Sequence, residues 1–170
     1  MSYDVIAYSL SNLVASPMDV QSLLADWSIV ARSADTSSPL PAADPFPPFC
    51  NVVAWQPSPD LPDVALLIRV NDEVALDRLY AQGRICSCML DIATDYSYSS
   101  EDLGNLADSS DPVLMETLTA VRTRYLTYTT AGRNSDSMDL QVDLCGALVA
   151  LHGGVFEDPQ LALIDVIAAA

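Results

Sequence analysis

Two kinds of hydrophobic pattern alternate along this chain. Runs rich in β-branched and apolar residues predict strands, and apolar residues that recur at helical spacing predict helices. The predicted strands cover residues 3–9, 49–56, 64–70, 85–92 and 124–130, with shorter extended pieces at 29–31 and 155–156. The predicted helices cover residues 17–27, 73–82, a segment that begins at 112, the stretch 139–152, and a short closing helix in the tail 161–170. The first long pair of strands, 49–56 and 64–70, is expected to form a hairpin.

The stretch 137–160 carries the strongest pattern in the chain. Leu140, Leu144 and Leu148 belong to a wide apolar stripe at helical spacing, and Ser137 is expected to cap that helix. Gly153 fits the left-handed position that ends a helix. Pro159 ends the short strand that follows, because proline has no backbone N–H to donate. This stretch is expected to hold the core and to carry no catalytic residue.

Strands that are neighbours in sequence, with helices between groups of strands, indicate an α+β fold. We expect a single domain over residues 1–170, built on an antiparallel or mixed sheet of about five or six strands with helices packed mainly on one face. Residues 33–48 contain five prolines and are predicted to form a long loop within this domain. Phe46 and Phe49 are expected to anchor the end of that loop.

Composition adds a strong negative charge to this picture. The chain has 23 acidic residues against 7 basic ones, all of them arginine, and a net charge of −16. Such a surface repels nucleic acid and anionic membranes, and it attracts basic partners or cations. The same charge is also compatible with solubility alone.

The sequence contains no apolar run of the ~18 residues that a membrane-spanning helix needs. Its N-terminus lacks the basic region of a signal peptide, so we expect a cytoplasmic protein. The cysteines are expected to be reduced and buried. Cys86 and Cys88 lie two apart on one face of a predicted strand, whereas zinc sites prefer the Cys-x-x-Cys spacing with further Cys or His ligands, and the chain has only one histidine.

Motifs that carry catalysis are missing from the sequence. There is no G-x-S-x-G nucleophile motif and no glycine-rich phosphate loop. His152 is interpreted as a partner for the C-terminal dipole of the long helix. Carboxylate pairs such as Asp139 with Asp143 are expected to lie on solvated faces. We predict no catalytic residue, no metal site and no cofactor.

The segment 94–111 has a composition of its own. It combines tyrosine and serine with acidic residues, a mixture typical of protein-binding loops because tyrosine offers a large contact area at small entropic cost. We predict that it docks on a basic protein surface, with charge steering the encounter. An ordinary solvated loop is the alternative. The predicted partner-binding residues are Asp91, Asp95, Tyr96, Tyr98, Glu101, Asp102, Asp108 and Asp111.

Residues 122–160 resemble immunity proteins of bacterial polymorphic-toxin and contact-dependent competition systems. The resemblance rests on the strand TYTTAGR at 127–133, the apolar helix DLQVDLCGALVALHGG at 139–154 and the closing VFEDPQ at 155–160. It covers about a quarter of the chain and concerns structure, with no functional residue in it. The resemblance implies a small, acidic, cytoplasmic domain that neutralises a cognate toxin by covering the active site of that toxin.

We therefore predict an immunity protein that is not an enzyme. Its expected partner is a cognate toxin domain with a basic surface, of the kind that acts on nucleic acid or nucleotides. The chain itself is predicted to bind neither nucleic acid nor membrane. Two alternatives stay open: a metal-assisted hydrolase that uses clustered Asp residues, and a non-catalytic adaptor module in a larger assembly.

Overall fold

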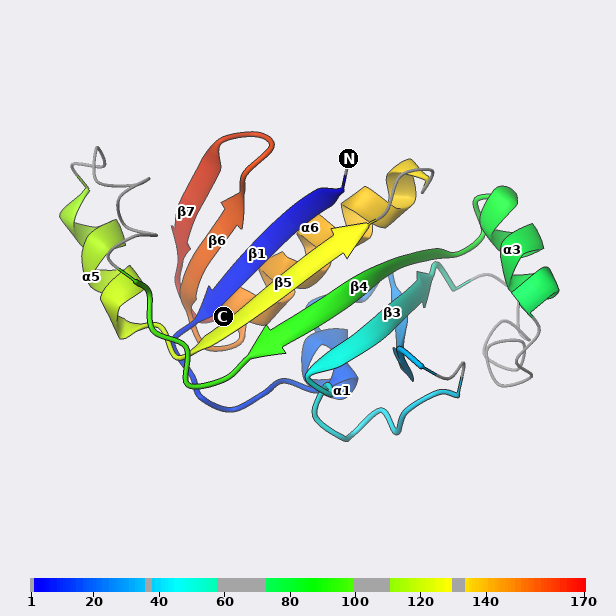
Figure 1. Cartoon of the computed structure of the whole chain (residues 1–170), viewed down its shortest axis with the longest axis horizontal. Helices are drawn as coiled ribbons and strands as arrows, with labels where there is room; N and C mark the ends of the chain where they lie inside the picture. The colour runs from blue at the N-terminus through cyan, green and yellow to red at the C-terminus, as the bar shows by residue number, and fades with distance from the viewer. Residues whose placement is uncertain (1, 36–37, 58–72, 100–110, 130–133) are drawn as a thin grey trace.

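A seven-stranded antiparallel sheet forms the body of the protein (Figure 1). The computed structural model describes residues 2–35, 38–57, 73–99, 111–129 and 134–170. The strand order is β2-β3-β4-β5-β1-β6-β7, and each neighbouring pair is antiparallel. The predicted α+β class is thus confirmed, with more strands than the sequence indicated. The strands are β1 (Tyr3–Ser9), β2 (Ser28–Ser33), β3 (Phe49–Trp55), β4 (Cys86–Ala93), β5 (Thr123–Thr129), β6 (Gly154–Asp158) and β7 (Leu163–Ile167).

Helix α6 (Ser135–Ala150) crosses one face of the sheet and supplies the centre of the core (Figure 1). Its Leu140, Leu144 and Leu148 are fully buried in the main hydrophobic cluster, as their spacing predicts. The short helix α1 (Pro17–Gln21) packs on the same face. Among the described residues, no helix combines the length and the apolar character needed to cross a membrane.

The start of α6 differs from the prediction. Asn134 caps the helix, because its side-chain oxygen accepts a hydrogen bond from the N–H of Ser137 at 3.1 Å. Ser137 lies in the first turn of the helix, at its third residue, and is fully buried. Its hydroxyl oxygen accepts a hydrogen bond from the N–H of Ser87 at 3.2 Å, which ties α6 to β4.

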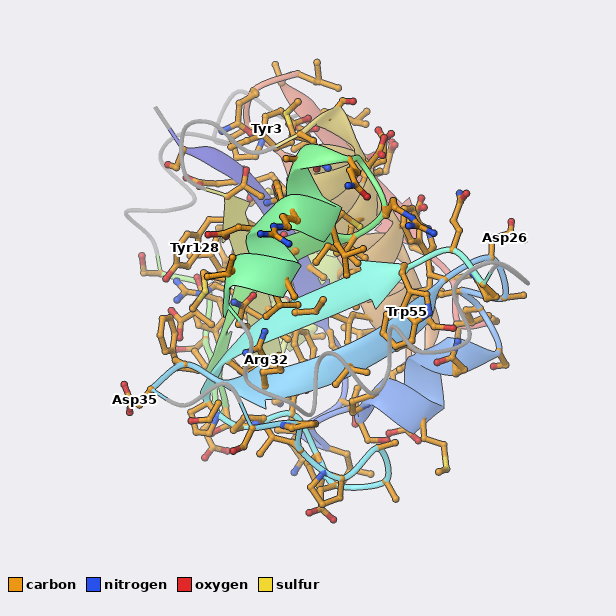
Figure 2. The ribbon with its side chains drawn as sticks, turned by 90° about the vertical axis from the view of Figure 1, so that its right-hand side faces the viewer. Tyr3, Asp26, Arg32, Asp35, Trp55 and Tyr128 are labelled. Atoms are coloured by element: carbon orange, nitrogen blue, oxygen red, sulfur yellow. The ribbon has the colours of Figure 1, made fainter. Side chains whose placement is uncertain are left out.

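Two further helices pack at the two ends of the opposite face, which we call the outer face. Helix α5 (Pro112–Ala120) lies at one end, with Leu118 fully buried against the sheet. Helix α3 (Glu73–Ala81) lies at the other end, where Leu79 shares a smaller cluster with Trp55. Figure 2 views the molecule from this α3 end and labels Trp55. The outer face is therefore flanked by helices, while α6 spans the inner face.

Several local predictions were wrong. The tail forms β7, which pairs with β6, rather than a closing helix. Helix α1 ends at Gln21, well before Trp27. Phe46 is buried as expected, but Phe49 begins β3 and is 45% exposed. Strand β3 pairs with β2 on one side and with β4 on the other, so it has no free edge at which the second strand of the predicted hairpin could pair. The partner strand of that hairpin, 64–70, lies outside the described residues.

All four cysteines are free and buried, as expected. Cys86 and Cys88 share the face of β4 that packs in the main core. Burial raises the pKa of Cys50, Cys86 and Cys145 to about 12. Thiols with so high a pKa are almost entirely protonated at neutral pH and are poor nucleophiles, so these residues act as core side chains.

We expect the stability of the domain to fall at alkaline pH. In the unfolded chain the thiols release their protons near pH 9, whereas the folded protein holds those of Cys50 and Cys145 to about pH 12. The unfolded state therefore binds fewer protons in this window. The contribution of these thiols to the free energy of unfolding should therefore be constant below about pH 9 and should decrease between about pH 9 and pH 12. Urea midpoints measured at increasing pH check this, and a midpoint that stays constant to about pH 11 would contradict it.

Candidate protein-binding site

Three tyrosine rings meet on the outer face of the sheet, close to α5. Tyr8 comes from β1, and Tyr96 and Tyr98 come from the segment after β4. Their ring centroids are 5.8 Å apart for Tyr8–Tyr96, 5.3 Å for Tyr8–Tyr98 and 6.3 Å for Tyr96–Tyr98. The last two pairs are edge-to-face, a favourable geometry for aromatic rings. We call these three residues the tyrosine platform; Tyr8 is buried, and the other two are half-buried.

A tight turn after β4 returns the chain to the sheet. Asp95 adopts the left-handed conformation, with φ of 52°, which aspartate tolerates better than most residues. The N–H of Tyr96 then donates a hydrogen bond to the carbonyl of Arg122 at 2.8 Å, just before β5. This backbone contact holds the segment where its tyrosines can reach Tyr8.

Arg124 connects the tyrosine platform to Asp91. It lies opposite Tyr8 in the β1–β5 register, and its guanidinium carbon is 5.4 Å from the centre of the Tyr96 ring. Its Nη2 is 3.6 Å from Oδ2 of Asp91, whose side chain is 42% exposed. An ion pair this exposed adds little to the free energy of unfolding. Together with the cation–π contact, it fixes the position of Arg124 beside the Tyr96 ring.

Carboxylates surround the platform. Glu157 accepts a hydrogen bond from the hydroxyl of Tyr8 at 2.9 Å. Burial, followed by the negative charge of Glu157, raises the pKa of Tyr8 well above its usual value. On the neighbouring strand the pKa of Tyr128 is also raised, by burial and then by the charges of Asp91 and Asp4. Both hydroxyl groups stay protonated at physiological pH, so they remain hydrogen-bond donors in a region of negative potential.

The structure brings four of the predicted partner-binding residues to one part of the outer face: Asp91, Asp95, Tyr96 and Tyr98. Asp111 has an evident local role, because it caps α5 and accepts from the N–H groups of Val113 at 2.9 Å and Leu114 at 3.3 Å. The remaining predicted residues, Glu101, Asp102 and Asp108, lie outside the described residues.

Sequence reasoning missed Tyr8, Arg124 and Glu157. One signal could have helped to find them. Side chains alternate between the two faces of a strand, so the sequence of β1 and of β5 shows which residues share a face with Tyr8 and with Arg124. The missing information was the pairing of strands. Tyr8 faces Arg124 on one side and Val155 on the other, and all three are far apart in sequence.

The described residues contain no group of three side chains placed to bind a metal ion. Asp139 and Asp143 are exposed on α6, as predicted, and His152 is exposed just after that helix. The platform offers contact area, hydroxyl donors and negative charge, which suit docking on a basic protein surface.

Comparisons with protein-family models, with curated proteins and with solved structures each found no match. The fold and the surface define this chain as an α+β domain with an acidic, tyrosine-rich outer face.

Proposed function

We propose that this domain is an immunity protein, a non-catalytic inhibitor that binds a cognate bacterial toxin. It docks through the tyrosine platform and the adjoining acidic segment 94–111. The observation that carries the proposal is the position of the platform beside Asp91 and Asp95, in a chain with a net charge of −16. The sequence resemblance over residues 122–160 supplies the particular class of inhibitor.

The packing of the platform supports a docking role. Each ring already contacts the other two, and Arg124 lies over one of them. A partner that binds here immobilises few additional side chains, so it loses less conformational entropy on binding. The half-buried Tyr96 and Tyr98 still present part of their surface, and tyrosine is among the residues enriched at interaction hot spots.

The charge distribution supports a basic partner. Asp4, Asp91 and Glu157 lie on the outer face near the platform. A complementary field of this kind raises association rates by about one to three orders of magnitude at low salt. Toxin domains that act on nucleic acid or nucleotides carry basic clefts, and such a cleft is the complementary surface that an acidic inhibitor needs.

Co-expression with the product of the neighbouring gene tests this function. That protein would be produced in a bacterial host with and without this chain, with growth as the readout, and binding of the purified pair would be measured by surface plasmon resonance. We expect growth rescue and a tight heterodimer. The association rate should fall about tenfold between low and physiological salt, because salt screens the attraction.

A charge-matched pair of double variants provides the control. Asp91→Asn with Asp95→Asn removes two charges beside the platform, whereas Asp44→Asn with Asp165→Asn removes two exposed charges elsewhere. The first pair should weaken protection and the second should not. Absence of a complex, or equal effects of the two pairs, would argue against this docking surface.

A further inference from the structure

A groove lies on the inner side of the molecule, between α6 and the segment that follows α1. Its volume is about 550 Å³. The buried residues Leu24 and Phe156 line it, together with Leu23 and Val142, which are 40% and 37% exposed. Val142 is an apolar residue of α6 that stays exposed in this groove. The other described residues therefore leave part of the apolar surface of α6 uncovered.

Trp27 stands beside this groove in a fixed orientation. Its indole N–H donates a hydrogen bond to Oδ2 of Asp143 at 2.8 Å, and its carbonyl accepts one from the side-chain amide of Gln21 at 2.6 Å. The same residue lines a second hollow of about 340 Å³, which reaches Asp136 and Asp139 on α6. A tryptophan held between two hollows has the properties of an interaction hot spot.

Gly146 gives the groove its depth along α6. Glycine destabilises the middle of a helix relative to alanine, so its presence there needs a reason. A Cβ atom at this position would meet no other atom within 4 Å, so packing among the described residues does not require glycine. With Ala150 one turn later, Gly146 forms a low strip that another helix can approach closely.

The charge around the groove is negative. Asp26 and Asp143 line it, and none of its lining residues in the described part of the chain is basic. Asp136 and Asp139 continue the row of carboxylates along α6, in the second hollow, which they share with one basic residue, Arg84. In Figure 2, Asp26 and Tyr128 lie on opposite sides of the molecule, which separates the groove from the outer face. An apolar centre with acidic margins complements a helix whose apolar side is bordered by lysine or arginine.

We propose that this groove binds a basic amphipathic helix of another protein, with Trp27 as the anchor. This second interaction surface lies on the inner side and does not depend on the proposed function of the tyrosine platform. A second copy of this chain is a poorer occupant, because it would bring a further net charge of −16 toward the same carboxylates.

Tryptophan fluorescence gives a direct readout of the groove. The chain has two tryptophans, so Trp55→Phe leaves Trp27 as the only one. The probe is a synthetic helical peptide about five turns long, with leucines on one face and lysines beside them, and its matched analogue carries glutamate in place of each lysine. We expect the lysine peptide to shift the Trp27 emission and to bind about tenfold or more tightly than the glutamate peptide.

Gly146→Leu is the variant that fills the groove. Leucine is a good helix former and has open space at this position, so the fold should be kept. Binding of the lysine peptide should weaken about tenfold, whereas Val113→Leu on the exposed side of α5 should leave it unchanged. Asp26→Asn combined with Asp143→Asn should also weaken binding, since asparagine keeps an acceptor for the Trp27 indole and removes only the charge.

Three outcomes would overturn the proposal: unchanged binding to Gly146→Leu, equal binding of the two peptides, or no change in Trp27 emission with either. Sedimentation supplies a further test. A homodimer that Gly146→Leu dissociates would assign the groove to a second copy of the chain and would likewise overturn the basic-helix assignment.

Discussion

Replacing Gly154 by alanine is expected to lower the free energy of unfolding by about 3 kcal/mol or more. Gly154 begins β6 opposite Ser9 of β1, and its φ is +149°. A Cβ atom at this position would lie 1.9 Å from the carbonyl oxygen of Tyr8. The carbonyl oxygen is a backbone atom and the added Cβ is bonded directly to the backbone. The overlap therefore cannot be relieved by moving a flexible side chain. Strands β1 and β6 would have to separate within the sheet.

Gly146→Ala is the matched control for this prediction. An added Cβ finds open space there, and alanine favours the helix, so the free energy of unfolding should rise by about 0.5–1 kcal/mol. Urea denaturation followed by circular dichroism compares both variants with the parent protein. A Gly154→Ala protein as stable as the parent would contradict the close approach of β1 and β6.

Replacing Tyr98 by alanine is expected to speed dissociation of the toxin complex about 30-fold, if the platform is the docking surface proposed above. The ring packs edge-to-face on both Tyr8 and Tyr96, so its loss removes a contact surface and loosens its two neighbours. Asp95→Asn should act differently. It removes an exposed charge and should slow association several-fold while leaving dissociation nearly unchanged.

Surface plasmon resonance separates these two effects, because it measures association and dissociation rates independently. Tyr98→Phe keeps the ring and serves as the control, so it should dissociate much more slowly than Tyr98→Ala. Urea denaturation of each variant shows that the domain is still folded. Dissociation rates that are the same for Tyr98→Ala and the parent protein would remove Tyr98 from the interface.

Local patterns gave reliable predictions where the structure depends on neighbours in sequence. The Ser16–Pro17 start of α1 and the Asp111–Pro112 start of α5 follow from capping and from the fixed φ of proline. The apolar stripe of α6 follows from the helical period. The turn at Gly153, with φ of +74°, follows from the freedom of glycine.

Predictions failed where contacts with a strand override the local preference of a segment. The alanine-rich tail favours a helix in isolation, yet its residues 163–167 pair with β6 and form an edge strand. Ser137 has the side chain of a helix cap, but the approach of β4 recruits its hydroxyl as an acceptor for Ser87, and Asn134 becomes the cap. In both cases a strand supplied the hydrogen-bond partners that decided the outcome: the preceding strand β6 for the tail, and β4, 50 residues away, for Ser137.

The features of the two candidate surfaces also fall into those that the local sequence determines and those that depend on tertiary contacts. The sequence by itself determined the acidic charge, the tyrosines at 96 and 98, and the apolar width of α6, because these are properties of composition and period. Only the tertiary structure placed Tyr8 and Arg124 beside those tyrosines, and only it set Trp27 against Asp143. The physical reason is that strand register and helix docking join segments more than 100 residues apart, and no local preference specifies which segments meet.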